Sequence, residues 1–558
     1  MKKLLLGAAV SAALLSGVAH AAISVNADGT PTAATLADTT RVYLSGSSAL
    51  QQLVEGSLLN GTKDGVCKTG TLRKYQDTPT AGNDQVAYLC ELNAGAATLN
   101  PVLNTLKTHA GTWKSNLLLY KRNNGGSLKG TVPVANNQTI EFLEVENNAG
   151  TCTPIAAGSY AATVNCDYNA STNRNLSIPD FGIADVEPKI FTTASANAPV
   201  GTANLATGYK VSPGIAAVFG VTVTTKLRNA LQEAQFGKGN ACVGSETEAC
   251  MPSLASRQIA DIFAAYPAPV APLTTPALGA GKIHDWKQLK VGTSDLWTAA
   301  SAAYRPTSSK VHICSRTAGS GTKAQFGIRF LDNACNPVGS KLVGQADYVG
   351  ENEVAGSTPV TEAAVRPIVH AMASSGGQEE CMDELDLDTN NSSGSFNSSI
   401  YTGARWAIGY NSLDKNASRS KSYRFIKVDG VAPTIQNVAN GSYHDWVEST
   451  YLYRTGAVNP LKGDMLTLVN EIINSFGKPA VVATANAKAV HSFGTSAFLS
   501  VPNAYHPANV NGSVTLSSPV NPLSYAIYPS NANPSNNCRV PLIYSTTTNN
   551  AQGLQLVP

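Results

Sequence analysis

Charge is scarce in this chain, and several common functional motifs are absent from it. Only 14% of its 558 residues are Asp, Glu, Lys or Arg, and the formal net charge is +3. So small a positive balance argues against binding to nucleic acid through bulk charge. The sequence contains no C-x-x-C, H-E-x-x-H or G-x-S-x-G, the usual signals of a zinc site or a serine hydrolase. We therefore predict neither an enzyme activity nor a cofactor.

Length and apolar content, in contrast, are sufficient for a large folded protein. A chain of 558 residues is too long for one ordinary core, so two or more lobes are expected. Hydrophobic residues make up 43% of the chain, which excludes disorder throughout. The abundance of Ala, Gly, Ser, Thr and Asn is more typical of an exported protein than of a cytosolic one.

The N-terminus has the features of a secretory leader. Two lysines precede an apolar run over residues 4–15, and the small residues Ala19 and Ala21 follow. A membrane anchor is the alternative, but the run is short and no second apolar span follows it. No cysteine lies at the cleavage region, which argues against a lipid anchor. We expect a leader over residues 1–21 and a mature protein in the periplasm or outside the cell.

Ten cysteines agree with an oxidising compartment, where an even number usually means disulfides. A metal cluster is the competing interpretation, but the thiols are widely scattered and lack metal-ligand spacing. The sequence leaves the connectivity open. Proximity along the chain suggests the pairs Cys67–Cys90, Cys152–Cys166, Cys242–Cys250 and Cys314–Cys335, which leaves Cys381 for Cys538.

The segment "SRTAGSGTKAQF", residues 315–326, combines an arginine with a glycine-rich turn and the start of a helix. Glycines let backbone N–H groups turn inward, and a helix start presents unpaired donors at the positive end of its dipole. Arg316 would add a planar fork of donors, and Ser320 and Thr322 would add hydroxyls. These groups together would suit an oxyanion. A flexible loop with a surface arginine is the alternative, because G-S-G-T alone is a weak signal.

A second turn-plus-helix pattern lies near the N-terminus, in "RVYLSGSSALQQLVEGSLL". Residues 41–44 alternate as a strand does, residues 46–48 form a turn, and a helix with one apolar face follows. Ser47 or Ser48 would cap this helix or contact a ligand. The apolar face consists of Leu50, Leu53, Val54 and Leu58, and Phe326 and Phe330 should likewise share one face of the later helix.

A carboxylate ends the apolar segment "NLSIPDFGIAD", at Asp185. Such a residue is usually a turn former or a solvated group. Beside an oxyanion it would have a different effect, because an ionised Asp only accepts hydrogen bonds. It would favour a hydrogen phosphate, which has an O–H, and reject fully ionised sulfate, which has none.

The order of several segments resembles that of phosphate-type periplasmic binding proteins, the receptors of the high-affinity phosphate ABC importer. The resemblance covers about two thirds of the mature chain in scattered blocks. This chain is longer than a typical member of that family. The extra segments are residues 67–178, 242–250 and 385–403 and the part after residue 459, where we expect mostly surface loops or small strands. The blocks that carry the resemblance are Ser253–Pro269, Gly281–Leu289, Ser315–Phe326, Trp406–Leu413, Phe425–Tyr443 and Thr450–Gly456.

The resemblance implies an α/β protein with two lobes, of the type II-like periplasmic binding class, with a ligand cleft between the lobes and extra loop and strand insertions. Lobe 1 would comprise residues 22–213 plus 425–558, and lobe 2 residues 214–424. Two departures stand out: Ala184 replaces a serine, and Ala318 replaces an aspartate that commonly orients the arginine. The implied ligand residues are Ser47, Ser48, Ala49, Ser127, Asp185, Arg316, Ser320, Gly321 and Thr322.

The implied function is that of an exported, monomeric receptor for inorganic phosphate or a related oxyanion. It would deliver its ligand to an inner-membrane ABC permease, or scavenge phosphate outside the cell. The alternative is a secreted surface, matrix or adhesion protein built on the same fold, because the insertions and the Asn- and Thr-rich ends could serve assembly. Stabilisation of the folded chain by micromolar phosphate would distinguish a receptor from a structural protein.

Overall fold

The computed structural model describes most of the chain from residue 23 to residue 499. The predicted leader, over residues 1–21, and Cys335 lie outside the described residues. The described ranges are 23–77, 84–95, 99–109, 111–146, 151–169, 171–191, 205, 208–264, 283–333, 367–389, 401–439, 441–456, 458–499, 524–525, 537–538, 542–544 and 554–556.

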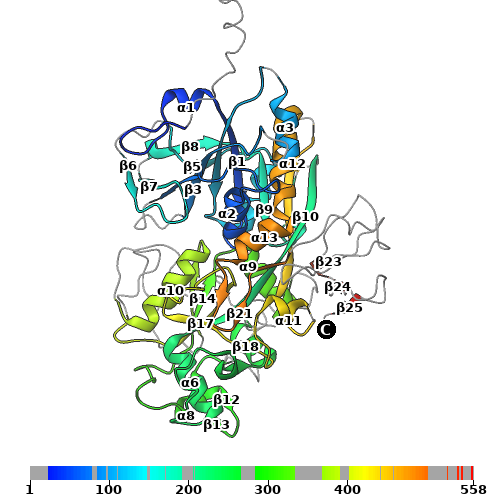
Figure 1. The fold of residues 1–558 in the computed structure, drawn as a ribbon. Helices are drawn as coiled ribbons and strands as arrows, with labels where there is room; N and C mark the ends of the chain where they lie inside the picture. Colours follow the sequence, from blue (N-terminus) through cyan, green and yellow to red (C-terminus); the bar gives the residue numbers. More distant parts are fainter. Residues whose placement is uncertain are drawn as a thin grey trace, which may run out of the picture.

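One mixed sheet of 14 strands runs through the molecule, in the order β15-β14-β16-β10-β19-β9-β1-β4-β3-β2-β7-β6, with β17 and β22 also paired to β10 (Figure 1). The predicted α/β class is thereby confirmed. The strands are β1 (Thr39–Gly46), β2 (Arg73–Asp77), β3 (Gln85–Glu91), β4 (Asn116–Arg122), β6 (Cys152–Ile155), β7 (Ala162–Cys166), β9 (Phe181–Ala184), β10 (Tyr209–Thr224), β14 (His312–Arg316), β15 (Ile368–Met372), β16 (Ala407–Ser412), β17 (Tyr423–Phe425), β19 (Trp446–Arg454) and β22 (Phe498–Leu499).

Helices cover the sheet, and short strand pairs lie outside it. The helices are α1 (Ala33–Ala37), α2 (Gln51–Leu59), α3 (Pro101–Lys107), α4 (Gly126–Lys129), α5 (Val132–Ala135), α6 (Thr225–Phe236), α7 (Ser256–Phe263), α8 (Leu296–Ala299), α9 (Gly321–Leu331), α10 (Ser375–Leu387), α11 (Ile435–Ala439), α12 (Gly463–Phe476) and α13 (Pro479–Asn486). The outlying strands are β5 (Ile140–Leu143), β8 (Arg174–Ser177), β11 (Ser253–Leu254), β12 (Lys290–Val291), β13 (Ser294–Asp295), β18 (Lys427–Val428), β20 (Val490–His491), β21 (Gly494–Thr495), β23 (Ser524–Tyr525), β24 (Leu542–Tyr544) and β25 (Leu554–Leu556).

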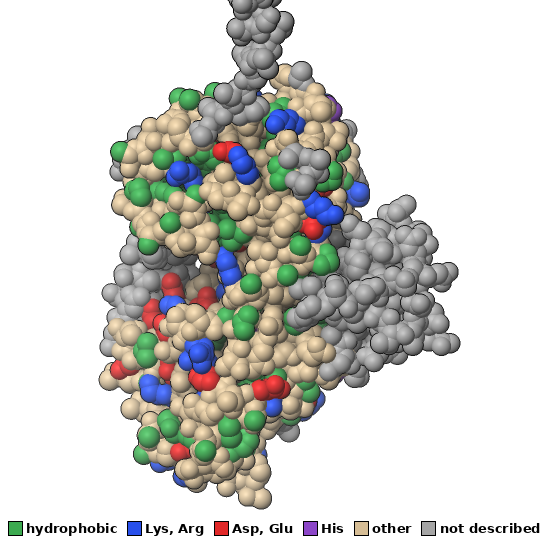
Figure 2. Space-filling model, in the orientation of Figure 1, with side chains coloured by type: hydrophobic (Ala, Val, Ile, Leu, Met, Phe, Trp, Pro, Cys, Tyr) green, Lys and Arg blue, Asp and Glu red, His purple; other side chains and the backbone are tan. Residues whose placement is uncertain are grey.

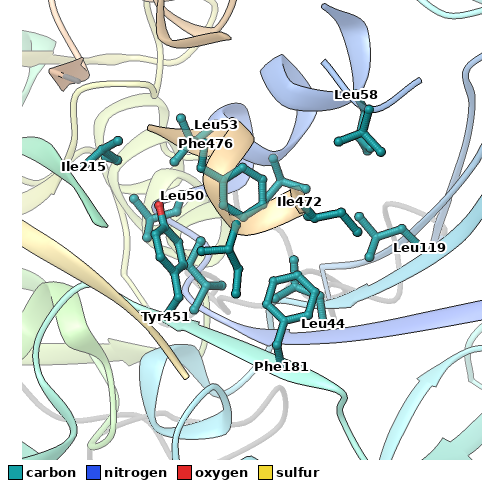
Figure 3. Packing of buried hydrophobic residues seen from close by; sticks show 14 of the residues in the cluster. Leu44, Leu50, Leu53, Leu58, Leu119, Phe181, Ile215, Tyr451, Ile472 and Phe476 are labelled. Atoms are coloured by element: carbon teal, nitrogen blue, oxygen red, sulfur yellow. The ribbon is translucent and has the colours of Figure 1, made fainter. Parts of the chain in front are cut away.

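The molecule has two lobes, which Figure 1 shows one above the other. We call the upper body, with β1–β4, β9, α2, α12 and α13, the first lobe. The lower body, with β14–β17, α6, α9 and α10, is the second lobe. Leu50, Leu53 and Leu58 of the predicted apolar face are buried in the first lobe's core, where Ile472 and Phe476 of α12 pack against them (Figure 3). The leucines of that face bury apolar area as predicted, and the rest of α2 is buried as well, since Gln51 and every residue from Leu53 to Leu58 are buried.

The second lobe has its own core and meets the first lobe along β10. Phe326 and Phe330 pack together at a ring-centroid distance of 4.6 Å, as predicted for one face of α9. The early part of β10 pairs with β19, and its last part pairs with β16 and β17. Helix α11 packs in a cluster with Cys314 and Met372, although the predicted boundary places it in lobe 1. The division at residues 213 and 424 stays a prediction.

Two expectations from the sequence were wrong in this part of the molecule. The segment over residues 67–178 was expected to form mostly surface loops or small strands, but it supplies β2, β3 and β4 of the main sheet. The apolar run of β4 is fully buried from Leu117 to Tyr120. Either Ser47 or Ser48 was expected to cap α2, but the N-cap is Leu50, without a side-chain cap. The Ser47 hydroxyl instead accepts a hydrogen bond from the Ala49 N–H at 3.1 Å.

The disulfides follow sequence proximity in three cases and depart from it in the fourth. The pairs Cys67–Cys90, Cys152–Cys166 and Cys242–Cys250 form as predicted. Cys314 pairs with Cys381, so the predicted Cys314–Cys335 and Cys381–Cys538 pairs were wrong. The reason is topological, because α10 packs against β14 and brings together two residues 67 apart in sequence. No helix among the described residues is long and apolar enough to cross a bilayer.

Candidate functional site

The candidate site lies where the carboxyl ends of parallel strands from both lobes meet. Strand β1 runs parallel to β4 and β9, with Ser45 opposite Arg122 and Gly46 opposite Ile183. In the second lobe, β14 runs parallel to β15, with Arg316 opposite Met372. The turns after these strands therefore converge, as strand ends do in open α/β sheets. Every ligand residue implied by the sequence lies at this junction and is buried: Ser47, Ser48, Ala49, Ser127, Asp185, Arg316, Ser320, Gly321 and Thr322.

Arg316 is 1% exposed, and main-chain carbonyls and hydroxyls hold its guanidinium. Its Nε donates to the Met372 carbonyl at 3.2 Å, and its Nη2 donates to the Ala373 carbonyl at 3.1 Å. Its Nη1 donates to Ser375 Oγ at 3.0 Å, and Nη2 reaches Ser48 Oγ at 3.4 Å. Burial lowers the pKa of Arg316, whereas Tyr410, Asp185 and Asp84 raise it. Arg316 forms no ion pair with a carboxylate in the described part of the chain, so its charge is left for another anion.

Asp185 accepts a hydroxyl from each lobe. Ser47 Oγ donates to its Oδ1, and Thr322 Oγ1 donates to its Oδ2 at 3.0 Å. Its backbone N–H donates to Ser127 Oγ at 3.0 Å. Burial raises the pKa of this carboxyl group, and the hydrogen bonds from Ser47 and Thr322 oppose the rise, as does the charge of Arg316. Asp185 is thus an acceptor held in place from both lobes.

The start of α9 approaches the first lobe so closely that only glycine fits. A Cβ on Gly321 would lie 2.2 Å from Ser127 Oγ and 2.8 Å from Asp185 Oδ2. Ser320 caps α9 by accepting the Lys323 N–H at 3.2 Å. Across the interface, the Leu128 N–H donates to the Gly319 carbonyl at 2.9 Å. The loop before α9 and the turn at α4 are therefore in direct contact.

Unused backbone donors face the same junction. The N–H groups of Gly321 and Thr322 precede the first intrahelical bond of α9, and neither has an acceptor among the residues that the structure describes. The Ser48 N–H, in the turn before α2, likewise has no acceptor among the described residues. A helix start with free N–H groups beside a buried arginine favours an anion with several oxygens.

No family model and no curated protein matches the chain. The chain is similar to substrate-binding proteins of phosphate ABC transporters.

Three of the similar solved structures come from bacteria. One is a phosphate ABC transporter substrate-binding protein with bound phosphate from Clostridium perfringens, with 14% identity, a TM-score of 0.32, and coverage of 80% of this chain and 98% of that chain. PstS from Borrelia burgdorferi has 11% identity, a TM-score of 0.27, and coverage of 80% and 97%. A phosphate transport receptor from Vibrio cholerae has 14% identity, a TM-score of 0.25, and coverage of 56% and 79%.

The two departures noted in the sequence have different surroundings. At Ala318 no carboxylate is available to orient Arg316, and the carbonyls of Met372 and Ala373, at the end of β15, hold the guanidinium instead. Ala184 is buried and pairs with Thr450 in β19, so it contributes to the sheet. The arginine is therefore positioned without being neutralised.

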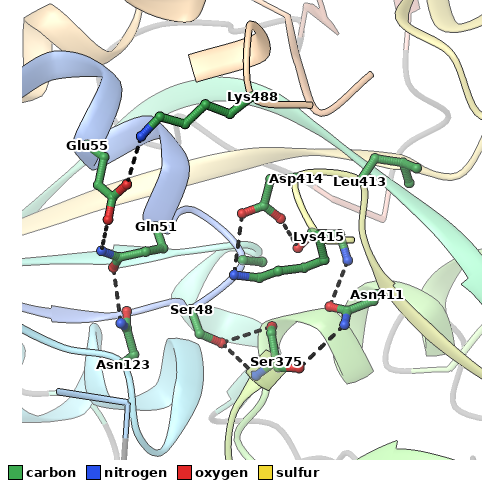
Figure 4. Close-up of polar contacts among 12 residues, drawn as sticks. Ser48, Gln51, Glu55, Asn123, Ser375, Asn411, Leu413, Asp414, Lys415 and Lys488 are labelled. Carbon is green, nitrogen blue, oxygen red and sulfur yellow. Dashed lines mark hydrogen bonds and ion pairs between the residues drawn. The ribbon is translucent and has the colours of Figure 1, made fainter. Parts of the chain in front are cut away.

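Sequence reasoning missed two residues of the site. Ser375 accepts from Arg316, and its hydroxyl lies 3.0 Å from that of Ser48 in the other lobe (Figure 4). The signal was present, because "MASSGG" places serines and glycines between an apolar strand and a helix, as around Ser47 and Ser320. Lys121 was also missed, because nothing in "NLLLYKR" shows that a lysine at the end of a strand is buried.

Proposed function

We propose that the chain is an exported binding protein for phosphate, or for a closely related tetrahedral oxyanion, which it holds between its two lobes. The observation that carries the proposal is the fully buried Arg316, which has no carboxylate partner in the described chain and lies beside unused N–H donors. A buried guanidinium without a counter-charge is costly, so an anion is the natural complement.

Asp185 supports phosphate over other oxyanions. A carboxylate accepts hydrogen bonds, so it fits a ligand oxygen that still carries a proton and repels one that does not. Hydrogen phosphate has such a proton and fully ionised sulfate does not. Each oxygen of Asp185 accepts one hydroxyl, and an ionised carboxylate can accept further hydrogen bonds, so Asp185 can still accept a ligand O–H.

Delivery to an inner-membrane ABC permease, or scavenging outside the cell, is part of the proposal, as is a monomer exported by the leader over residues 1–21. On the face in Figure 2, Lys and Arg side chains are scattered over both lobes, and acidic side chains gather at the waist between the lobes. Closure of the two lobes around the ligand would be hinge-like, and the contacts between Ser48 and Ser375 would then form last.

Calorimetric titration tests the proposal. The protein is unfolded, dialysed free of phosphate and refolded, and phosphate is then titrated into it. We expect saturable heat at micromolar phosphate, competition by arsenate and a higher melting temperature with ligand. No heat, no competition and an unchanged melting temperature would refute a phosphate receptor and favour the surface or matrix protein.

A further inference from the structure

Lys121 is a second buried cation, directly behind the turn that follows β1. It lies in β4 and is 0% exposed. Its Nζ donates to the Ser47 carbonyl at 2.9 Å and to Asn123 Oδ1. Asn123 in turn donates to Gln51 Oε1 at 3.0 Å (Figure 4). This bond connects Lys121, through Asn123, to the start of α2. The ammonium group therefore contacts the residue just before Ser48, in the turn that also carries the Ser47 hydroxyl.

This lysine has neutral acceptors but forms no ion pair among the described residues. The charged groups that face it are Asp84 before β3, Asp185 after β9, Glu55 of α2 and Lys415 after β16. The three carboxylates favour its ammonium form and Lys415 disfavours it. Burial is the largest influence and lowers the pKa of Lys121 to about 7. Without a ligand, Lys121 therefore exchanges its proton near neutral pH.

We propose that Lys121 is the proton-linked positioning residue of the site: anion binding is coupled to the uptake of one proton by its Nζ, and affinity falls as that nitrogen loses its proton. The inference depends on the proposed function, because it concerns the same anion. The proton comes from solvent and stays on Nζ while the anion is bound. Lys121 acts through the Ser47 turn and through its charge, with no direct contact to the ligand required.

The coupling follows from linkage between charge and binding. A bound anion favours the charged form of a nearby lysine, so it raises the pKa of Lys121. At a pH below 7 the ammonium is already present and binding needs no proton. At pH 8.5 the free protein holds Lys121 mostly neutral, and binding must draw a proton from the buffer. Phosphate's own ionisation also changes over this range, but it is common to the wild type and its variants and cancels in their ratio.

The experiment is calorimetry of phosphate binding at pH 6.0 and 8.5, in buffers of different ionisation enthalpy. At pH 8.5 we expect the wild type to take up more protons on binding than Lys121→Met does, by up to one proton according to how far the anion raises the pKa of Lys121. The ratio of wild-type to variant affinity should be about tenfold or more at pH 6.0 and fall several-fold by pH 8.5. Lys129→Met is the matched control, because Lys129 faces Arg122 and Glu141 rather than the Ser47 turn. It should match the wild type in proton uptake.

A measurement on the wild type alone covers the case in which the variant fails to fold. In protein labelled with ¹³C at lysine Cε, one resonance should titrate near pH 7 without phosphate and at least one pH unit higher with it. Equal proton uptake by the wild type and Lys121→Met, or no lysine that titrates near neutral pH, would overturn the inference and leave phosphate binding intact. A wild type that binds no phosphate at either pH would instead refute the proposed function.

Discussion

The two sides of the site hold their charged groups in different ways. On the second-lobe side, the carbonyls of Met372 and Ala373 fix Arg316, so its orientation depends on the main chain between β15 and α10. On the first-lobe side, hydroxyl and amide side chains contact Asp185 and Lys121, and Lys121 also donates to the Ser47 carbonyl. Arg316 stays charged at every pH at which the protein folds, whereas the carboxyl group of Asp185 and the amino group of Lys121 can change protonation state. The second lobe therefore supplies a constant positive charge, and the first lobe supplies the groups that respond to protons.

The largest expected effect comes from removing the constant positive charge of Arg316. Arg316→Ala deletes a charge-assisted fork in a closed junction, and we expect it to weaken phosphate and arsenate alike by roughly 2 to 5 kcal/mol. Titration calorimetry measures the loss, and the melting temperature without ligand should change little. Arg316→Lys keeps the charge but lacks the planar fork of donors, so its phosphate affinity should lie between those of the wild type and Arg316→Ala. Binding within threefold of wild type would mean that Arg316 is not the main determinant.

The first-lobe side is tested through selectivity rather than affinity. Asp185→Asn replaces an obligate acceptor by a group that also donates an N–H, so sulfate should gain relative to phosphate by about 1 to 3 kcal/mol. The measurement is the ratio of the two affinities at one pH. Asp180→Asn is the control, because Asp180 accepts the Tyr43 N–H at 2.8 Å, at the start of β9 and away from the junction. An unchanged ratio in Asp185→Asn would show that Asp185 does not select phosphate, and the ligand could then be named only as an oxyanion.

The smallest expected effect concerns the contact between the two sides. Ser375→Ala removes one acceptor of Arg316 and the hydroxyl pair with Ser48, which should cost about 0.5 to 1.5 kcal/mol of binding. Ser374→Ala is the matched control. Ser374 caps α10 by accepting the Gly377 N–H, so its loss should lower stability by about 1 kcal/mol and leave affinity nearly unchanged.

A double-mutant cycle with Ser48→Ala shows whether the contact joins the lobes when ligand is bound. Because the two hydroxyls lie 3.0 Å apart, the effects of the two substitutions on phosphate affinity should fall short of additive. Additive effects would show that each serine acts only on its own side.

Local patterns predicted the parts of the site that one segment specifies alone. The alternation before Gly46 and the spacing of Leu50, Leu53 and Leu58 gave a strand, a turn and a helix, and the structure contains all three. The glycine-rich turn before a helix start located Arg316, whereas Ser127 was implied only by the resemblance to phosphate-type periplasmic binding proteins. The ligand roles of these residues stay predictions, because a shared location does not establish binding.

What failed depended on packing between distant segments. Cys314 and Cys381 pair because α10 crosses β14, and sequence proximity carries no information about that crossing. Strand β4 was expected among surface insertions because its flanks are rich in Asn and Gly, although its own run from Leu117 to Tyr120 is apolar. Lys121 is charged and was not considered, because burial of its Nζ depends on three strands and a turn.

The position of α12 and α13 on the first lobe has a consequence for when this chain can fold. Helix α13 packs on α2 and α12 packs on α3, and Ser57 of α2 makes a hydrogen bond with Ser475 of α12. The core of the first lobe therefore stays open until the chain has been made through Asn486. Contacts of such long range are slow to form, because the loops between them must close first. The lobe that begins the sequence is thus the last to be completed, after the second lobe has all of its strands.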